Sequence, residues 1–443
     1  MARPLCFVLM PFGKKPDPAG ALVDFDAVYR ELIAPSIEAA ELEPIRADEE
    51  VVGGVIHKAM YERLLLCEYA VADLTTANAN VFYELGIRHA ARPRSTVLIF
   101  SENTRLPFDV APMRALPYRL TAGGTPDDVE ASRTTLASRL REARDASTDS
   151  PLFQMLDGFS PPDIARLKTD VFRDRVRYSS ETKERLAEAR NTGRAALSEI
   201  EEQLVPVSDA EAGVVIDLFL SYRDVKAWDA MIELVDKMSP PLAETVMVQE
   251  QLGLALNRAG RGDQAERVLL DLVKRRGPSS ETYGILGRVY KDRWQAALKD
   301  GDERKARGFL KKAIDAYLQG FEADWRDAYP GINAVTLMEL LEPPDPRRLT
   351  LLPVVAYAVE RRVAGGEPDY WDHVTRLELA VLAKDQETAD NALDDALAEN
   401  PKDWQTESTA NNLGMIREAR EKRGEEVSWA NEIEQALLQE SSN

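Results

Sequence analysis

The pair Leu252-Gly253 recurs as Leu286-Gly287, 34 residues further along the chain. A period of 34 residues is typical of tetratricopeptide repeats, in which each unit is a pair of helices. Small residues are needed where the paired helices approach closely, and large residues fill the neighbouring layer. The repeat therefore predicts a stack of helix pairs that bury one continuous core.

Other small and large residues fit the same pattern in three copies, and the second copy contains a charged insertion over 299–307. They are Leu256, Ala265, Leu269, Tyr290, Ala313, Tyr317, Ala389, Leu393, Ala396 and Pro401. We therefore predict tetratricopeptide-like repeats over 206–443, preceded by a helical connector over 126–205.

The first 125 residues show a different pattern, in which short apolar runs alternate with segments of helical spacing. Strands are expected at 4–10, 43–47, 69–74, 95–101 and 117–120, with helices at 25–40, 55–67 and 81–91. Such alternation predicts βαβ units and a mostly parallel sheet. We predict a flavodoxin-like, doubly wound α/β domain over 1–125, which binds ligands beyond the carboxyl ends of its strands.

Composition excludes several classes of function. The chain has a formal net charge of −20, and residues 126–443 carry 43 Lys and Arg against 60 Asp and Glu, which disfavours nucleic-acid binding. Two cysteines and three scattered histidines predict neither a disulfide framework nor a metal site. No apolar run is long enough for a membrane span, so a cytoplasmic protein is expected.

Polar residues gather after the third predicted strand. Asp73 ends this strand, Asn78 follows in the loop, and Glu84 comes about one turn into the next helix, for which Asn80 is a candidate N-cap. Such residues lie on the rim where an α/β sheet collects its ligand. A purely structural interpretation is also open, because Asp73 would satisfy loop N–H groups and Glu84 would complement the helix dipole.

Three segments resemble a known group of proteins: Val8–Phe12, Ala72–Thr75 and Asn78–Gly86. Together they resemble the nucleoside 2-deoxyribosyltransferase-like and Toll/interleukin-receptor (TIR)-like Rossmannoid domains. The resemblance implies that Glu84 matches the glutamate that attacks the sugar or holds the nicotinamide ribose. Asn78 stands where deoxyribosyltransferases tend to place an aspartate, which departs from the transferase pattern.

The remainder of the chain resembles a second family, in six blocks that occur in the same order. The blocks are Leu218–Val225, Leu256–Arg258, Gly287–Asp292, Gly320–Glu322, Tyr329–Asn333 and Tyr370–Asp372. They are similar to the TRAF-binding tetratricopeptide regulatory region of the apoptosis signal-regulating kinases, where a receptor-like Rossmannoid domain precedes it. Protein-kinase motifs are absent from this sequence. Those kinases lack the glutamate that matches Glu84.

The first hypothesis is enzymatic. The N-terminal domain would cleave the N-glycosidic bond of NAD or a related nucleotide through an oxocarbenium-like sugar, whose charge Glu84 would stabilise or trap. Asp73 and Asn78 would orient ribose hydroxyls or water, and the repeats would regulate a homo-oligomeric enzyme by binding a protein partner. The predicted nucleotide contacts are Met10, Pro11, Phe12, Gly13, Asn80 and Tyr83.

The second hypothesis is a non-enzymatic signalling scaffold. The Rossmannoid domain would self-associate or sense a nucleotide, and the repeats would present a concave groove to a partner segment. A catalytic site needs Glu84 accessible in a pocket, whereas a scaffold tolerates it covered.

Charged and aromatic residues of the repeats are interpreted structurally. We expect buried or half-buried Arg–Asp pairs between repeat helices among Arg223, Asp224, Arg288, Lys291 and Asp292. We also expect core or inter-repeat packing for Trp294, Trp325, Trp371 and Trp404.

Overall fold

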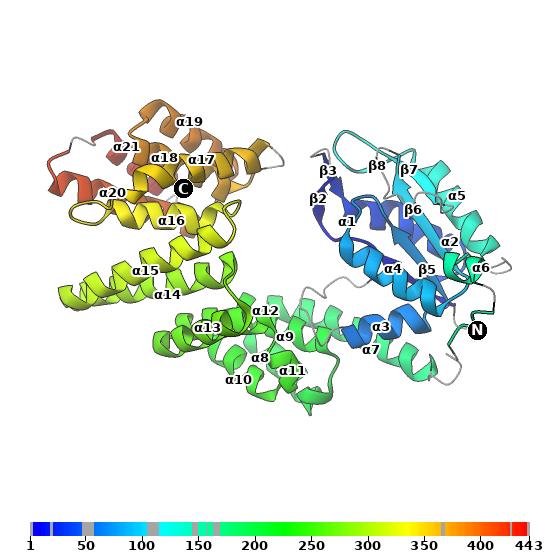
Figure 1. Ribbon diagram of the computed structural model, residues 1–443. Coiled ribbons are helices and arrows are strands. Elements are labelled where there is room, and N and C mark those ends of the chain that lie inside the picture. The colour runs from blue at the N-terminus through cyan, green and yellow to red at the C-terminus, as the bar shows by residue number, and fades with distance from the viewer. Residues whose placement is uncertain are drawn as a thin grey trace. The chain divides into compact units, whose positions relative to one another are not determined.

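The chain forms two compact units, Met1–Val225 and Lys226–Asn443 (Figure 1). The computed structural model describes residues 3–17, 21–46, 57–102, 104, 115–143, 149–156, 158–162, 169–364, 368–425 and 428–440. The domain boundaries predicted at residues 125 and 205 remain predictions. Among the described helices, none has the length and apolarity that crossing a bilayer requires.

A mainly parallel sheet forms the centre of the first unit. Its parallel strands are β1 (Leu5–Leu9), β4 (Glu43–Arg46), β5 (Tyr69–Asp73), β6 (Thr96–Ser101) and β7 (Leu116–Leu120). An antiparallel edge strand, β8 (Pro126–Asp127), completes the spatial order β4-β1-β5-β6-β7-β8. All five predicted strands and their parallel direction are therefore confirmed.

The helices around this sheet begin close to the predicted positions. They are α1 (Phe25–Ala27), the π-helical segment η1 (Val28–Ile33), α2 (Ala34–Ala39), α3 (His57–Leu66), α4 (Ala79–Ala91) and α5 (Val129–Glu142). Successive β1 side chains point to opposite faces. Cys6 and Val8 pack with η1, α2 and α5, whereas Phe7 and Leu9 pack with α3 and α4, so helices cover both faces.

The strand order locates the rim on which a ligand would bind. Counted along the chain, the parallel strands stand in the order 2-1-3-4-5, which is the order of flavodoxin-like sheets. The order reverses between β1 and β5, so the loops after these two strands lie side by side at the switch point. Assignment to the flavodoxin-like fold itself remains a prediction.

A small hairpin near the rim was not predicted. It consists of β2 (Lys14–Pro16) and β3 (Leu22–Asp24), which pair antiparallel. Three-residue strands are too short to show an alternating pattern, and Lys-Lys-Pro contains no β-branched or aromatic residue.

Beyond β8 and α5, which pack with the sheet, the predicted connector is helical. Its elements, with the first helix of the next predicted region, are α6 (Pro151–Met155), α7 (Thr169–Thr192), α8 (Arg194–Gln203), the 3-10 helix η3 (Val207–Asp209) and α9 (Ala212–Asp224). Gly193 separates α7 from α8 with a φ of +107°, a conformation that a residue with a Cβ rarely adopts.

The second unit consists of helices, of which α12 to α21 pack as five consecutive pairs. They are α10 (Trp228–Lys237), α11 (Pro240–Ala243), α12 (Val246–Arg258), α13 (Gly262–Arg276), α14 (Ser280–Lys299), α15 (Glu303–Ala323), α16 (Ala328–Glu339), α17 (Arg347–Ala364), α18 (Tyr370–Ala383), α19 (Gln386–Ala398), α20 (Asp403–Lys422) and α21 (Ser428–Glu440). The predicted solenoid of helix pairs is therefore confirmed.

The repeated glycines lie where paired helices touch. A Cβ on Gly253 would come within 2.7 Å of the Leu269 side chain, and one on Gly287 within 2.6 Å of the Tyr317 ring. Leu269 and Tyr317 were predicted as the large residues of the same two repeats. The 34-residue spacing thus marks the same close contact between the two helices of a pair, which occurs in two successive repeats.

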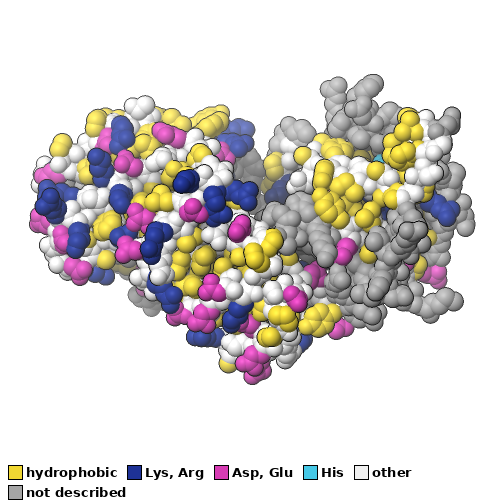
Figure 2. Space-filling view, turned by 60° about the horizontal axis from the view of Figure 1, so that its bottom comes forward, with side chains coloured by type: hydrophobic (Ala, Val, Ile, Leu, Met, Phe, Trp, Pro, Cys, Tyr) yellow, Lys and Arg dark blue, Asp and Glu magenta, His cyan; other side chains and the backbone are white. Residues whose placement is uncertain are grey.

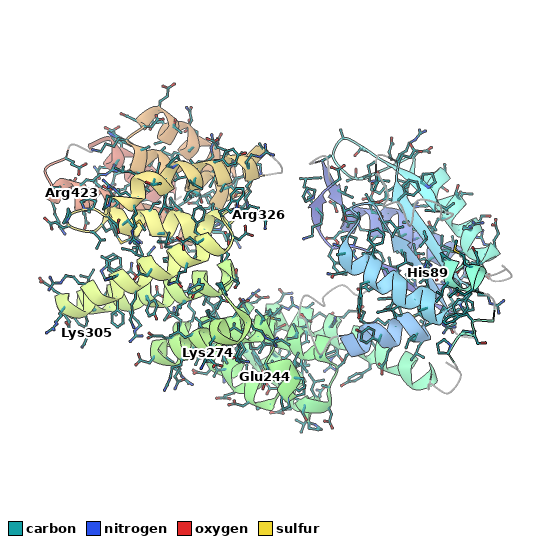
Figure 3. All side chains as sticks on the ribbon, in the orientation of Figure 1. His89, Glu244, Lys274, Lys305, Arg326 and Arg423 are labelled. Carbon is teal, nitrogen blue, oxygen red and sulfur yellow. The ribbon has the colours of Figure 1, made fainter. Side chains whose placement is uncertain are left out.

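A buried arginine joins three of the helices. Arg420 of α20 donates to Glu339 of α16 at 3.0 Å and to the carbonyls of Val381 and Leu382 at the end of α18. Only 2% of the Arg420 side chain and 4% of the Glu339 side chain are exposed. Arg423, labelled in Figure 3, also binds the Glu339 carboxylate. The Leu382 carbonyl is among those that a helix end leaves without an internal partner, whereas the Val381 carbonyl also accepts from the Lys384 N–H at 3.1 Å.

Candidate functional site

The loop after β1 forms one side of the rim. Met10 and Pro11 are buried, whereas Phe12 and Gly13 are half-buried. Gly13 has a φ of +64°, and its N–H donates to Asp26 Oδ1 at 3.2 Å. This loop is therefore fixed by its own domain, and its predicted nucleotide contacts remain predictions.

Arg46, at the end of β4, was missed by the sequence analysis. Its guanidinium lies between the rings of Phe12 and Tyr29, 4.7 and 4.8 Å from their centroids, and bonds Asp26 at 2.5 Å. This bond holds the pKa of Asp26 below its usual range. The sequence signal was a single arginine at the carboxyl end of a strand, which is too weak to identify a partner.

Asp73 is enclosed within the domain. It is 1% exposed, and its Oδ1 accepts hydrogen bonds from the Thr75 N–H at 3.0 Å and the Thr75 hydroxyl at 2.5 Å. Its Oδ2 accepts from the Tyr118 hydroxyl at 2.8 Å. The structural alternative, in which Asp73 satisfies a loop N–H group, is thus what the geometry shows. A role toward a ribose stays a prediction.

Burial raises the pKa of Asp73 to about 6, although the hydrogen bonds from Thr75 and Tyr118 oppose the change. The folded state therefore holds a proton that the unfolded state releases between about pH 4 and pH 6, so stability falls as pH rises through this window.

Asp73→Asn should reduce this loss. We expect the free energy of unfolding that the protein loses between pH 4.5 and pH 7 to be smaller by roughly 2 kcal/mol in the variant. Urea unfolding followed by circular dichroism at pH 4.5 and pH 7 measures it; equal losses in both proteins would contradict the prediction.

The opening of α4 corrects one prediction. Asn78, not Asn80, is the N-cap, because its side chain accepts from the N–H groups of Asn80 at 2.9 Å and Val81 at 3.3 Å. Asn80 is exposed at the second helical position. Since N-cap preferences of two nearby asparagines are equal, sequence alone could not choose between them.

Tyr83 and Glu84 lie in the second turn of α4. Tyr83 is 55% exposed, and its hydroxyl lies 2.9 Å from that of Tyr61. Glu84 is half-buried, between the accessible carboxylate that the enzymatic hypothesis needs and the covered one that a scaffold tolerates. The predicted residues Asp73, Asn78 and Glu84 thus lie on consecutive parts of one strand, loop and helix, with Asp73 turned into the domain.

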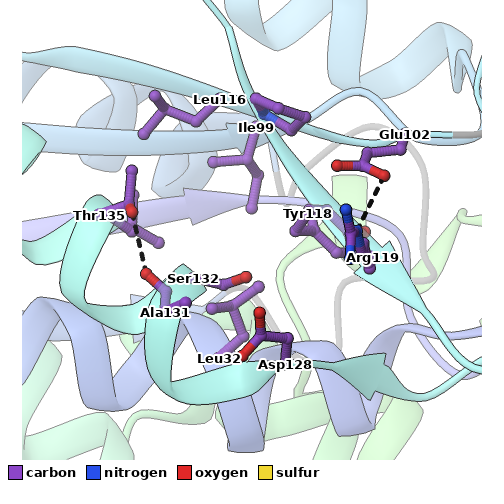
Figure 4. Close-up of a pocket in the computed structure, with 12 residues that line it drawn as sticks. Leu32, Ile99, Glu102, Leu116, Tyr118, Arg119, Asp128, Ala131, Ser132 and Thr135 are labelled. Carbon is purple, nitrogen blue, oxygen red and sulfur yellow. Dashed lines mark hydrogen bonds and ion pairs between the residues drawn. The ribbon is translucent and has the colours of Figure 1, made fainter.

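A cavity of about 220 Å³ lies elsewhere in this unit, between β6, β7 and α5 (Figure 4). The ion pair between Glu102 and Arg119, 3.1 Å apart, lies at its edge, and Asp128 and Ser132 line its other side. None of the predicted site residues lines this cavity. This cavity is thus separate from the switch point between β1 and β5.

The helical repeats contain a second group of interacting polar residues. Lys291 of α14 is 5% exposed, and its ammonium donates to Asn333 of α16 at 3.3 Å and Asn412 of α20 at 3.2 Å. Asn412 in turn donates to Glu378 of α18 at 3.0 Å. Burial lowers the pKa of Lys291 to about 8. One polar cluster therefore links the first helices of four consecutive pairs.

The expected Arg–Asp pairs between helices are corrected by this arrangement. Arg288 and Asp292 pair at 2.8 Å within one helix, because they stand four residues apart. Arg223 and Asp224 are exposed neighbours. Asp292 does join two helices, but through the Asn257 amide at 2.7 Å.

The tryptophan prediction holds for three of the four residues, because Trp371 of α18 and Trp404 of α20 pack against each other between repeats, with ring centroids 5.8 Å apart. Trp294 is buried in the core at 7% exposure, as expected, whereas Trp325, Trp371 and Trp404 are 53%, 41% and 58% exposed. All three lie in or next to the first turn of a helix, where the helical period does not reveal which face is buried.

Comparison with known proteins identifies the family. The profile of the MAP3K TRAFs-binding domain matches residues 81–437, which is most of the chain. This chain belongs to the MAP3K TRAFs-binding domain family. The predicted resemblance to the regulatory region of apoptosis signal-regulating kinases is thereby confirmed, whereas the TIR-like character of residues 1–125 stays a prediction.

Several curated relatives of this MAP3K TRAFs-binding domain protein are kinases. It is 29% identical over 219 residues to mitogen-activated protein kinase kinase kinase nsy-1 of Caenorhabditis elegans, covering 45% of this chain and 14% of the relative. It is 28% identical over 291 residues to human mitogen-activated protein kinase kinase kinase 6, covering 63% and 20%. The chain thus spans a fifth or less of the length of these relatives.

Solved structures with low overall similarity include tetratricopeptide-repeat proteins. A thermophilic TPR protein of Thermus thermophilus aligns with 47% of this chain and 98% of its own, at 16% identity and a TM-score of 0.34. A tetratricopeptide repeat protein of Parabacteroides merdae aligns with 61% and 98%, at 11% identity and a TM-score of 0.35. With scores this low, the repeat fold rests on the helix pairs described above.

Proposed function

We propose that this chain is a signalling scaffold of a kinase pathway, whose helical unit binds a protein partner. The observation that carries the proposal is the match of residues 81–437 to a partner-binding domain of MAP3K proteins. The family's name gives the partner class, TRAF proteins.

The packing of the repeats supports this proposal. Arg420 and the Lys291 cluster tie α14, α16, α18 and α20 together through buried side chains. A surface that is already rigid loses little conformational entropy when a partner binds. The second unit is thus built as a preorganised platform.

Calorimetric titration of the full chain with purified TRAF proteins tests the proposal. We expect saturable binding in the micromolar range, which is about 8 kcal/mol of binding free energy. If the folded chain binds none of the TRAF proteins at a concentration about 100-fold above the micromolar range, the assignment of TRAF proteins as partners is refuted.

We also propose a function for the rim of the sheet, which is supported by the reversal of strand order between β1 and β5, the strand that precedes the helix of Glu84. Here the domain binds NAD or a related nucleotide and cleaves its N-glycosidic bond, with Glu84 facing the sugar cation. A homo-oligomer regulated by the repeats would be the active form.

Release of free base from NAD, NADP and nucleosides at high protein concentration tests this second proposal. Glu84→Gln should lower release by on the order of 100-fold or more, because the amide cannot stabilise the developing positive charge. Glu130→Gln, at an exposed position of α5, is the matched control and should leave release unchanged. Equal release by Glu84→Gln and the unaltered chain would remove Glu84 from the reaction.

A further inference from the structure

Exposed aromatic side chains recur at one position of successive helices in the second unit. Tyr329, Trp371 and Trp404 are each the second residue of their helix, in α16, α18 and α20. They are 49%, 41% and 58% exposed, and Trp325, in the turn before α16, is 53% exposed. Because α16 packs against α18 and α18 against α20, these four residues follow one edge of the repeats. We call them the aromatic edge.

Contacts with other aromatic rings fix Tyr329, Trp371 and Trp404 of the aromatic edge. The Trp371 and Trp404 centroids lie 5.8 Å apart, and Trp371 also contacts Tyr370 at 5.2 Å. Tyr329 meets the buried Tyr317 edge-to-face at 6.1 Å. Single exposed aromatics are ordinary, but a fixed row of them is typical of a binding surface.

The same edge carries carboxylates. Glu281 is the second residue of α14, the position that the aromatic residues occupy in later helices, and Asp327 caps α16. Glu281 is exposed, and its two neighbours bind the other acids, because Ser280 donates to Asp327 and Thr282 donates to Glu250 at 2.5 Å. Within the described residues Glu281 has no cationic partner.

The arginine of the turn before α16 is paired with a different carboxylate. Arg326, labelled in Figure 3, is bound by Asp324 through two bonds of 2.8 and 3.0 Å. On the face shown in Figure 2, basic and acidic side chains are intermixed, with hydrophobic side chains exposed between them.

We propose that the aromatic edge, with Glu281 and Asp327, docks an arginine-bearing segment of the partner protein. A guanidinium stacks on indole and phenol faces and also forms paired hydrogen bonds with carboxylates, which an ammonium cannot do in the same way. The acidic balance of residues 126–443, 43 basic against 60 acidic side chains, favours the approach of such a segment. This inference rests on the proposed scaffold function and names the partner chemistry for it.

Fluorescence anisotropy of a labelled, end-blocked (Gly-Arg)4 peptide, titrated with the full chain, tests the proposal. We expect Trp371→Ala/Trp404→Ala to weaken binding at least about tenfold, and Glu281→Gln about threefold. Trp371→Tyr/Trp404→Tyr keeps the ring faces and should stay within about threefold of the unaltered chain. (Gly-Lys)4 should bind more weakly, and (Gly-Glu)4 should not bind.

Asp390→Asn/Asp394→Asn removes two exposed charges from the neighbouring helix α19 and is the matched control, with an expected change below about twofold. Unchanged affinity in the folded Trp371→Ala/Trp404→Ala variant, or an equal loss in the control, would overturn the proposal and indicate diffuse charge attraction. If a TRAF protein binds the Trp371→Ala/Trp404→Ala variant with the affinity of the unaltered chain, the aromatic edge is not the docking site, but the scaffold function still holds. If binding of (Gly-Arg)4 depends on the aromatic edge but no TRAF protein binds the chain, the docking site is supported and the assignment of TRAF proteins as partners is refuted.

Discussion

Replacement of Arg420 by Met should lower the free energy of unfolding of the second unit by about 2–4 kcal/mol. The side chain is 2% exposed and donates to Glu339 and to two carbonyls that end α18. Met fills a similar volume but leaves the Leu382 carbonyl without its donor and removes one donor from Glu339, and a buried unpaired acceptor costs about 1–3 kcal/mol.

Tryptophan fluorescence during urea unfolding measures this loss selectively, because all six tryptophans lie in the second unit. Arg275→Met is the control. Its pair with Asp271 is exposed and should contribute less than about 1 kcal/mol. A midpoint for Arg420→Met as high as that of the control would show that Arg420 does not join these helices.

The second large effect is expected at Gly287. Gly287→Ala should destabilise the second unit by about 1–3 kcal/mol, because the added Cβ would lie 2.6 Å from the buried Tyr317 ring. The helical preference for Ala, about 1 kcal/mol, acts in the opposite direction.

Gly308→Ala provides the matched control. Gly308 lies inside α15, and a Cβ there would meet no atom within 4 Å. This substitution should stabilise the unit by up to about 1 kcal/mol. If both variants shift the urea midpoint in the same direction, the close approach of α14 and α15 is not what the glycine serves.

The sequence predicted those parts of the fold that local patterns encode. The three strands that contain Cys6, Val71 and Val97 are short, mainly apolar runs, and the paired helices follow from Gly253 and Gly287. The small strands β2, β3 and β8 escaped prediction because two or three residues carry no periodicity.

Side-chain partners were harder to predict, because they depend on residues far apart in the chain. Arg46 contacts Phe12 and Tyr29, and Lys291 finds Asn412 at a separation of 121 residues. The exposure of Trp371 and Trp404 depends on which end of a helix packs against its neighbour, which no local pattern specifies. At the rim, the position of Asp73 was predicted, but its enclosure by Thr75 and Tyr118 was not.

Hydrogen–deuterium exchange of the full chain, with and without a saturating TRAF protein, tests the scaffold account most directly. The account predicts partner-dependent protection in peptides of Lys226–Asn443, above all around the starts of α16, α18 and α20. Protection confined to peptides of Met1–Val225 would contradict it, because the partner would then bind the sheet-containing unit and not the helical repeats.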